Sequence, residues 1–319
     1  MLLLSGCASG GGGDDLQVVS DPVAAVAATS PAPSVSPAGE VLGQRGEVTA
    51  MATAGRTLAV AVSEPPFLLL YDLDDLAAPP KEVTLPAAPE KLTVAGDEVL
   101  AALPGAGVLA RISVTDGALR TVPVPGKPAA AAVDGDRTLV AVRDRKALDV
   151  VNGEAVTATI SGNLYSADDV LVADGKTFVL DRLRTALFAV DTADGSIQEG
   201  LRAGNGATNA VADSYGRLLV ADTRGGALLA FGADPFLLRQ RYPVPGGIYG
   251  IAYDAKRSIA WVTLTERNEV VGFDVRGGEP VEKFRLPTVR QPNSVTVDEQ
   301  TSRVIVGSAA GEGIQVIAP

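Results

Sequence analysis

The stretch NAVADSYGRLLVADTRGGALLAFG (209–232) contains three short apolar segments separated by two polar turns. The apolar segments are too short for helices and the turns are rich in Asp, Gly and Arg, so the stretch predicts three consecutive antiparallel strands. The same pattern recurs six more times along the chain, at a period of about 40 residues. The six further copies are 48–73, 92–114, 130–151, 170–192, 250–275 and 294–318.

A fourth strand-like segment follows most copies and ends at a proline or glycine. Four strands per repeat, with no helical pattern of useful length, are typical of a β-propeller blade. The seventh copy lacks a fourth strand, and GEVLGQ (39–44) stands before the first copy, where such a strand belongs. We therefore predict an all-β fold over residues 38–319, a seven-bladed β-propeller of four-stranded antiparallel blades closed by this N-terminal strand. Large aromatic residues that fall inside strands are predicted to be core: Phe188, Phe231, Trp261 and Phe273.

The repeat ADSYGRLLVADTRGGALLAF (212–231) resembles an NHL-type repeat, and the repeat region is similar to the wider group of NHL and YncE-like propellers. The resemblance implies the fold. It implies little about function, because propellers of this kind include lyases, lactonases, receptors and scaffolds.

The beginning of the chain, MLLLSGC (1–7), resembles the end of a lipoprotein signal with its lipobox. The resemblance implies that Cys7 carries a lipid anchor and becomes the mature N-terminus. The apolar lead is shorter than the roughly 7–15 residues of a signal peptide, so we expect a start upstream or a trimmed chain. Residues 8–37 are rich in Gly, Ala, Pro and Ser and predict a flexible tether. We expect an extracytoplasmic protein, lipid-anchored to the bacterial cell membrane.

Composition excludes several classes of chemistry. The 319 residues include no histidine and one cysteine, and the formal net charge is −11. The absence of histidine excludes Ser-His-Asp catalysis and histidine zinc sites. It also argues against a lyase of the streptogramin type, because that family depends on a catalytic histidine. One cysteine allows no intrachain disulfide, and the acidic balance argues against nucleic acid as a partner.

The first positions of the innermost strands surround one mouth of the central channel of a propeller. Aligning the repeats places seven residues there: Glu47, Glu90, Ala129, Asp168, Thr208, Tyr249 and Asn293. Oxygen atoms of Glu47, Glu90, Asp168 and Asn293 are suitable ligands for Ca²⁺ or Mg²⁺. The alternative, which we favour, is a solvated acidic mouth without a bound ion.

Three arginines at similar offsets, Arg184, Arg224 and Arg267, follow the second strands of their blades. They predict a basic patch on a partner-binding face, suited to an anionic partner or substrate. We therefore expect a non-catalytic binding or scaffold module for an envelope protein or a small ligand. The alternative is a divalent-metal-dependent hydrolase or lactonase resembling the gluconolactonase-type propellers.

Overall fold

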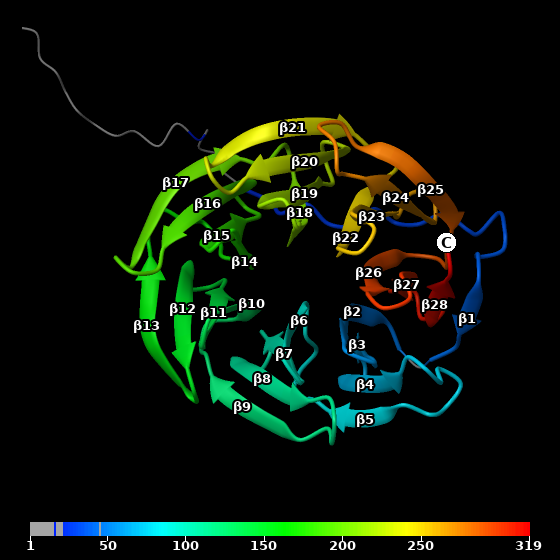
Figure 1. Ribbon diagram of the computed structural model, residues 1–319. Helices are drawn as coiled ribbons and strands as arrows, with labels where there is room; N and C mark the ends of the chain where they lie inside the picture. Colours follow the sequence, from blue (N-terminus) through cyan, green and yellow to red (C-terminus); the bar gives the residue numbers. More distant parts are fainter. Residues whose placement is uncertain (1–15, 17–21, 45) are drawn as a thin grey trace, which may run out of the picture.

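The computed structural model describes residues 16, 22–44 and 46–319. In this part of the chain, 28 strands form seven four-stranded antiparallel sheets arranged in a ring around a central channel (Figure 1). The predicted fold class is confirmed. Among the described residues, no helix is long and apolar enough to cross a membrane.

Each blade runs from the channel to the outer edge in chain order, except the last. The first blade contains β2 (Val48–Ala54), β3 (Thr57–Val62), β4 (Phe67–Asp72) and β5 (Lys81–Thr84). The second contains β6 (Leu92–Ala95), β7 (Glu98–Leu103), β8 (Val108–Ser113) and β9 (Leu119–Pro123). The third contains β10 (Pro128–Asp134), β11 (Arg137–Val142), β12 (Ala147–Asn152) and β13 (Ala155–Ser161). The fourth contains β14 (Asp169–Ala173), β15 (Lys176–Asp181), β16 (Ala186–Asp191) and β17 (Ser196–Arg202). The fifth contains β18 (Ala207–Ala212), β19 (Arg217–Asp222), β20 (Ala227–Gly232) and β21 (Leu237–Pro243). The sixth contains β22 (Ile248–Asp254), β23 (Ile259–Leu264), β24 (Glu269–Asp274) and β25 (Val281–Pro287). The seventh contains β26 (Pro292–Asp298), β27 (Arg303–Ser308), β28 (Ile314–Ile317) and, from the other end of the repeat region, β1 (Glu40–Leu42).

The middle strands are almost wholly buried because each blade packs both faces against its neighbours. β3 and β23 are apolar nearly throughout, whereas the outer strand β13 is mostly exposed and mixes polar with apolar residues. The core therefore consists of apolar clusters between adjacent blades rather than one central mass. The predicted core aromatics are confirmed as buried: Phe188, Phe231, Trp261 and Phe273.

The ring closes through its first strand. β1 pairs antiparallel with β28, in a register that sets Glu40 opposite Val316 and Leu42 opposite Ile314. Gln315, which is fully buried, donates hydrogen bonds from Nε2 to the carbonyls of Ala38 (2.6 Å) and Pro287 (3.0 Å). The prediction that residues 39–44 supply the missing strand is thus confirmed. The ring is closed both by the pairing of β1 with β28 and by the hydrogen bonds of Gln315.

Residues 22–31, which we call the strap, cross one face of the propeller over the fourth to seventh blades. Their carbonyl oxygens accept hydrogen bonds from side chains of those blades, and Ser30 Oγ donates to the carbonyl of Thr265 (2.6 Å). Within the tether expected over residues 8–37, the strap is therefore hydrogen-bonded to the propeller. Cys7 and most of the expected tether before the strap lie outside the described residues.

Candidate functional site

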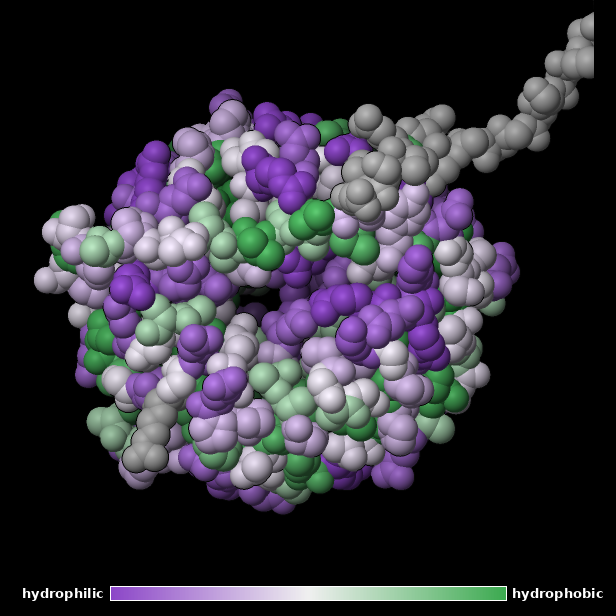
Figure 2. Space-filling model, turned by 180° about the vertical axis from the view of Figure 1, so that it is seen from behind, coloured by the Kyte–Doolittle hydropathy of each residue, from purple (hydrophilic) through white to green (hydrophobic). Residues whose placement is uncertain are grey.

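The mouth of the channel lies on the same face as the strap. All seven aligned positions line one cavity of about 460 Å³: Glu47, Glu90, Ala129, Asp168, Thr208, Tyr249 and Asn293. Each stands at or just before the start of an innermost strand, which is why one position per blade meets its equivalents here. Figure 2 views the molecule from the side opposite to Figure 1 and looks onto this face, where hydrophilic residues gather beside the channel opening.

Arg143, from the loop after β11, joins two of the mouth carboxylates. Its Nη1 and Nη2 donate to the two oxygens of Glu90 at 2.9 and 2.7 Å, and its Nε donates to Asp168 Oδ1 at 2.8 Å. Bidentate contacts of this kind are among the stronger hydrogen bonds in proteins. The second oxygen of Asp168 accepts the backbone N–H of Arg182 at 2.9 Å. The two carboxylates are therefore held in place by one guanidinium, which offsets one of their two negative charges.

This arrangement changes the acidity of the mouth. Burial alone would raise the pKa of Glu90, but the hydrogen bonds and positive charge of Arg143 outweigh burial and hold that pKa below its usual value. The pKa of Arg143 is raised in turn, chiefly by its hydrogen bond to Glu90. Both groups stay charged at neutral pH.

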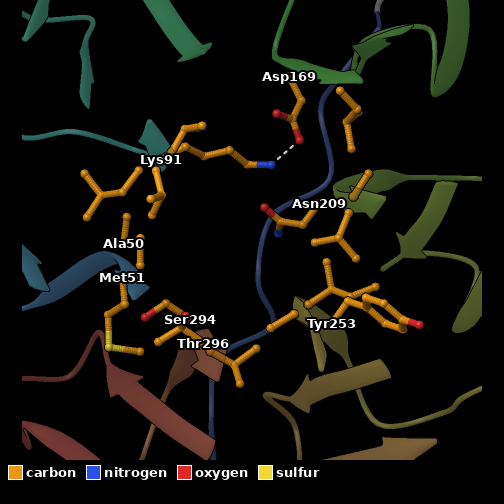
Figure 3. Close-up of a pocket in the computed structure, with 18 of the residues that line it drawn as sticks. Ala50, Met51, Lys91, Asp169, Asn209, Tyr253, Ser294 and Thr296 are labelled. Atoms are coloured by element: carbon orange, nitrogen blue, oxygen red, sulfur yellow. Dashed lines mark hydrogen bonds and ion pairs between the residues drawn. The ribbon is translucent and has the colours of Figure 1, made fainter. Parts of the chain in front are cut away.

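A second ion pair is formed by the residues that follow Glu90 and Asp168 in the chain. Lys91 Nζ bonds to Asp169 Oδ2, and the Asp169 side chain is almost fully buried (Figure 3). Burial raises the pKa of Asp169, and the charge of Lys91 partly opposes this effect. Lys91 precedes β6 of the second blade and Asp169 begins β14 of the fourth, so the pair connects two blades that are not adjacent in the ring.

The expected metal ligands do not form a metal-binding group. Among the described residues, no three Asp, Glu or Cys side chains come close enough together to hold a metal ion. Glu47, Glu90 and Asp168 share the cavity, yet the guanidinium of Arg143 lies between the carboxylates of Glu90 and Asp168. The side-chain cation of Arg143 thus lies between two of the four residues that were considered as ligands for a divalent ion.

Below the mouth, the channel widens into a cavity of about 550 Å³ lined by the innermost strands (Figure 3). Three of its polar side chains bond to the backbone of a neighbouring blade. Thr53 Oγ1 donates to the Val297 carbonyl (2.7 Å), Thr93 Oγ1 to the Ala131 carbonyl (2.7 Å), and Asn209 Nδ2 to the Tyr249 carbonyl (3.1 Å). These hydroxyl and amide groups connect adjacent blades through side-chain to backbone hydrogen bonds.

The three predicted partner-face arginines do not form one patch. Arg184 is buried, with its guanidinium 5.0 Å from the ring centre of Tyr165 and 5.2 Å from that of Phe188. Arg224 is exposed and donates to the carbonyl of Val23 in the strap (3.0 Å). Arg267 is also exposed, beside Gly246. The prediction was wrong for Arg184 because the aromatic side chains of its own blade cover it.

Three residues that organise this face were not among the predicted site residues: Arg143, Arg182 and Gln291. The sequence placed Arg143 and Arg182 in the loops after the second strands of their blades and assigned neither of them a role at the mouth. Arg143 reaches Glu90 across 53 residues of sequence, and Gln291 joins the mouth to the strap through Asn293 and Ala28. The repeat pattern placed Arg143 in a loop on this side of the ring. It could not show which neighbouring blade the side chain would reach.

The chain matches no protein-family model and no curated protein. Among solved structures, it resembles Kuenenia stuttgartiensis hydrazine synthase, with 14% sequence identity and a TM-score of 0.75 over 86% of this chain and 96% of that one. It resembles virginiamycin B lyase from Staphylococcus aureus, with 12% identity and a TM-score of 0.74 over 87% and 97%. A chain of the mitotic checkpoint complex matches with 10% identity and a TM-score of 0.77 over 96% and 99%. Likenesses at these identities show the fold, that of a seven-bladed β-propeller, and leave function open.

Proposed function

We propose that this chain is a lipid-anchored, extracytoplasmic protein of the NHL/YncE-like type, whose propeller is a non-catalytic binding or scaffold module. Its ligand, an envelope protein or a small molecule, would be recognised on the face that carries the channel mouth. The observation that supports this most is the clamp of Arg143 on Glu90 and Asp168. A rigid, charge-paired surface suits recognition.

The same clamp argues against acid–base catalysis at the mouth. A general base works best with a pKa near the working pH, and a general acid needs a raised pKa. Arg143 holds the pKa of Glu90 low and so makes it a weak base. Asp169, whose pKa is raised, is buried and bonded to Lys91.

The lyase among the structural neighbours does not favour an enzymatic role. One of those structures is a catalytically inactive histidine-to-alanine variant of virginiamycin B lyase with quinupristin. The present sequence contains no histidine. A reaction that depends on that side chain could not be carried out here in the same way.

Thermal scans with EDTA and with millimolar Ca²⁺ or Mg²⁺ test the metal-dependent alternative. We expect superimposable curves, because the Arg143 guanidinium occupies the space between the carboxylates of Glu90 and Asp168 and bonds to both. A bound ion would instead add about 2.7 kcal/mol of stability at a hundredfold excess over its dissociation constant. A cation-dependent rise in melting temperature that Glu90→Gln with Asp168→Asn abolishes would favour the hydrolase.

Replacing Cys7 with serine tests the anchor. When the protein is expressed with a full signal sequence, we expect the unmodified chain in the membrane fraction and the Cys7→Ser variant in the soluble extracytoplasmic fraction. The reason is that one acylated cysteine would be the sole attachment to lipid. Retention of the variant on membranes after a high-salt wash would contradict the proposal.

A further inference from the structure

The strap is held by a row of side chains that bind its main chain. Gln291 Nε2 donates to the Ala28 carbonyl (2.9 Å), and Asn268 Nδ2 donates to the Pro31 carbonyl (3.0 Å). Arg182 and Arg224 donate to the carbonyls of Ala25 and Val23. We call Arg182, Gly206, Arg224, Asn268 and Gln291 the track.

The track contacts mainly the backbone of the strap and few of its side chains. The side chains of Val23 and Val26 are 71% and 72% exposed, so they contribute almost nothing to the contact. Ala25 is the one buried side chain of the strap, and it approaches Gly206 so closely that a Cβ added there would lie 2.8 Å from the Ala25 methyl. The track thus requires an extended backbone and one small residue. An alanine- and proline-rich segment meets both requirements, since proline favours the extended conformation.

The strap leaves some polar atoms of the track without partners. Within the described residues, Asn268 Oδ1 and Arg182 Nε are buried and have no hydrogen bond. Asn268 is 6% exposed, and the residue that its amide contacts is Pro31, which has no N–H to donate. Buried polar atoms are normally hydrogen-bonded, so the strap is an incomplete match for this surface.

The track is also connected to the channel mouth. Gln291 Nε2 donates to Asn293 Oδ1 as well as to the strap, and the backbone N–H of Arg182 bonds to Asp168. In Figure 3, the strap is the blue ribbon that passes behind the channel between the sides of Asp169 and Thr296. A chain bound in the track therefore lies directly over the proposed recognition face.

We propose that the track is a binding site for an extended, alanine- and proline-rich segment of a partner polypeptide, and that the chain's own strap fills it in cis. This inference rests on the proposed function and names its partner class. Because the strap is covalently joined to β1, its effective concentration at the track is on the order of millimolar. Weak intrinsic binding is then enough to keep the track filled until a better-matched segment replaces the strap.

The test uses the full folded chain with Cys7→Ser and a protease site placed after Pro33, where residues 31–36 are all exposed. After cleavage and gel filtration, a fluorescent peptide of residues 22–31 is titrated into the nicked and the uncut protein. We expect binding to the nicked protein, and binding to the uncut protein weaker by about tenfold or more, because the attached strap competes. An unrelated extended Ala/Pro-rich peptide should bind the nicked protein comparably.

Matched variants assign the binding to the track. The peptide with Ala25→Leu should lose binding against Gly206, whereas Val26→Leu should bind unchanged. In the protein, Gln291→Ala should weaken binding by about tenfold through its lost hydrogen bonds, and Arg267→Ala, on the same face, should not.

Three results would overturn the inference. One is a folded, nicked protein that has lost its strap yet does not bind the peptide. Another is a cleaved strap that stays bound and does not exchange with a large excess of peptide. The third is binding of the strap peptide alone, with unrelated Ala/Pro-rich peptides excluded, since the strap would then be a dedicated latch. The proposed anchor and binding role would survive each of these, because the Cys7 and metal experiments test them separately.

Discussion

Deletion of residues 1–44 should cause a much larger loss of stability than deletion of residues 1–31. It removes β1, leaves β28 as an unpaired edge, and takes away the Ala38 carbonyl that Gln315 contacts. The open edge of the last blade and the loss of one of the two acceptors of the buried Gln315 amide together cost about 3 kcal/mol or more. For a chain of this size, that corresponds to a fall of roughly 5 °C or more in the melting temperature. Differential scanning calorimetry at a fixed scan rate measures it, and light scattering detects association through the new edge.

Deletion of residues 1–31 is the matched control. It removes the strap but keeps Ala38 and β1, so the ring remains closed. Leu16 and Ala25 are the buried apolar side chains lost from the described part of that segment, and we expect a smaller loss of stability. Equal melting temperatures for the two truncations would contradict closure through β1.

The sequence was sufficient to predict the ring because each blade is a local unit. Three strands and two turns are continuous in the chain, so their pattern is visible seven times, and the missing strand of the seventh copy pointed to residues 39–44. The same repetition aligned the mouth residues from Glu47 to Asn293. These predictions depend on spacing along the chain, which a sequence displays directly.

Contacts between blades could not be predicted in this way. The reach of Arg143 to Glu90 depends on how adjacent blades are rotated, and nothing within either repeat encodes the pairing. The strap was hidden for a different reason. Its composition is that of a flexible linker, and most of its contacts use backbone carbonyls, which every residue possesses. Composition can therefore predict that a segment has no core of its own. It does not show whether the surface of the folded propeller will bind that segment.

The second large effect is expected at the seam between the last and first blades, where Asp298 ends β26. Its Oδ1 accepts Arg56 Nη1 (2.9 Å) from the first blade, and its Oδ2 accepts Arg303 Nη2 (3.0 Å) and Thr301 Oγ1 (2.7 Å). The Asp298 side chain is 1% exposed. Asp298→Asn keeps the shape but removes the charge that two arginines share, which should lower the free energy of unfolding by about 3 kcal/mol. Asp74→Asn is the control, because Asp74 also pairs with Arg56 but its side chain is 68% exposed, and little change is expected there.

The pH dependence distinguishes this charge from a packing effect. Burial would raise the pKa of Asp298, but hydrogen bonds from Thr301 and Arg303 lower it to about 2, against an ordinary value of 3.8. Because the folded state favours the ionised carboxylate, its contribution is complete above pH 4 or so and is lost as the pH falls toward about 2. Denaturant unfolding of both proteins between those limits should show the wild type losing stability faster, so that the gap to Asp298→Asn narrows. A gap that stays constant across this range would mean that the asparagine destabilises the seam through its packing and not through the missing charge.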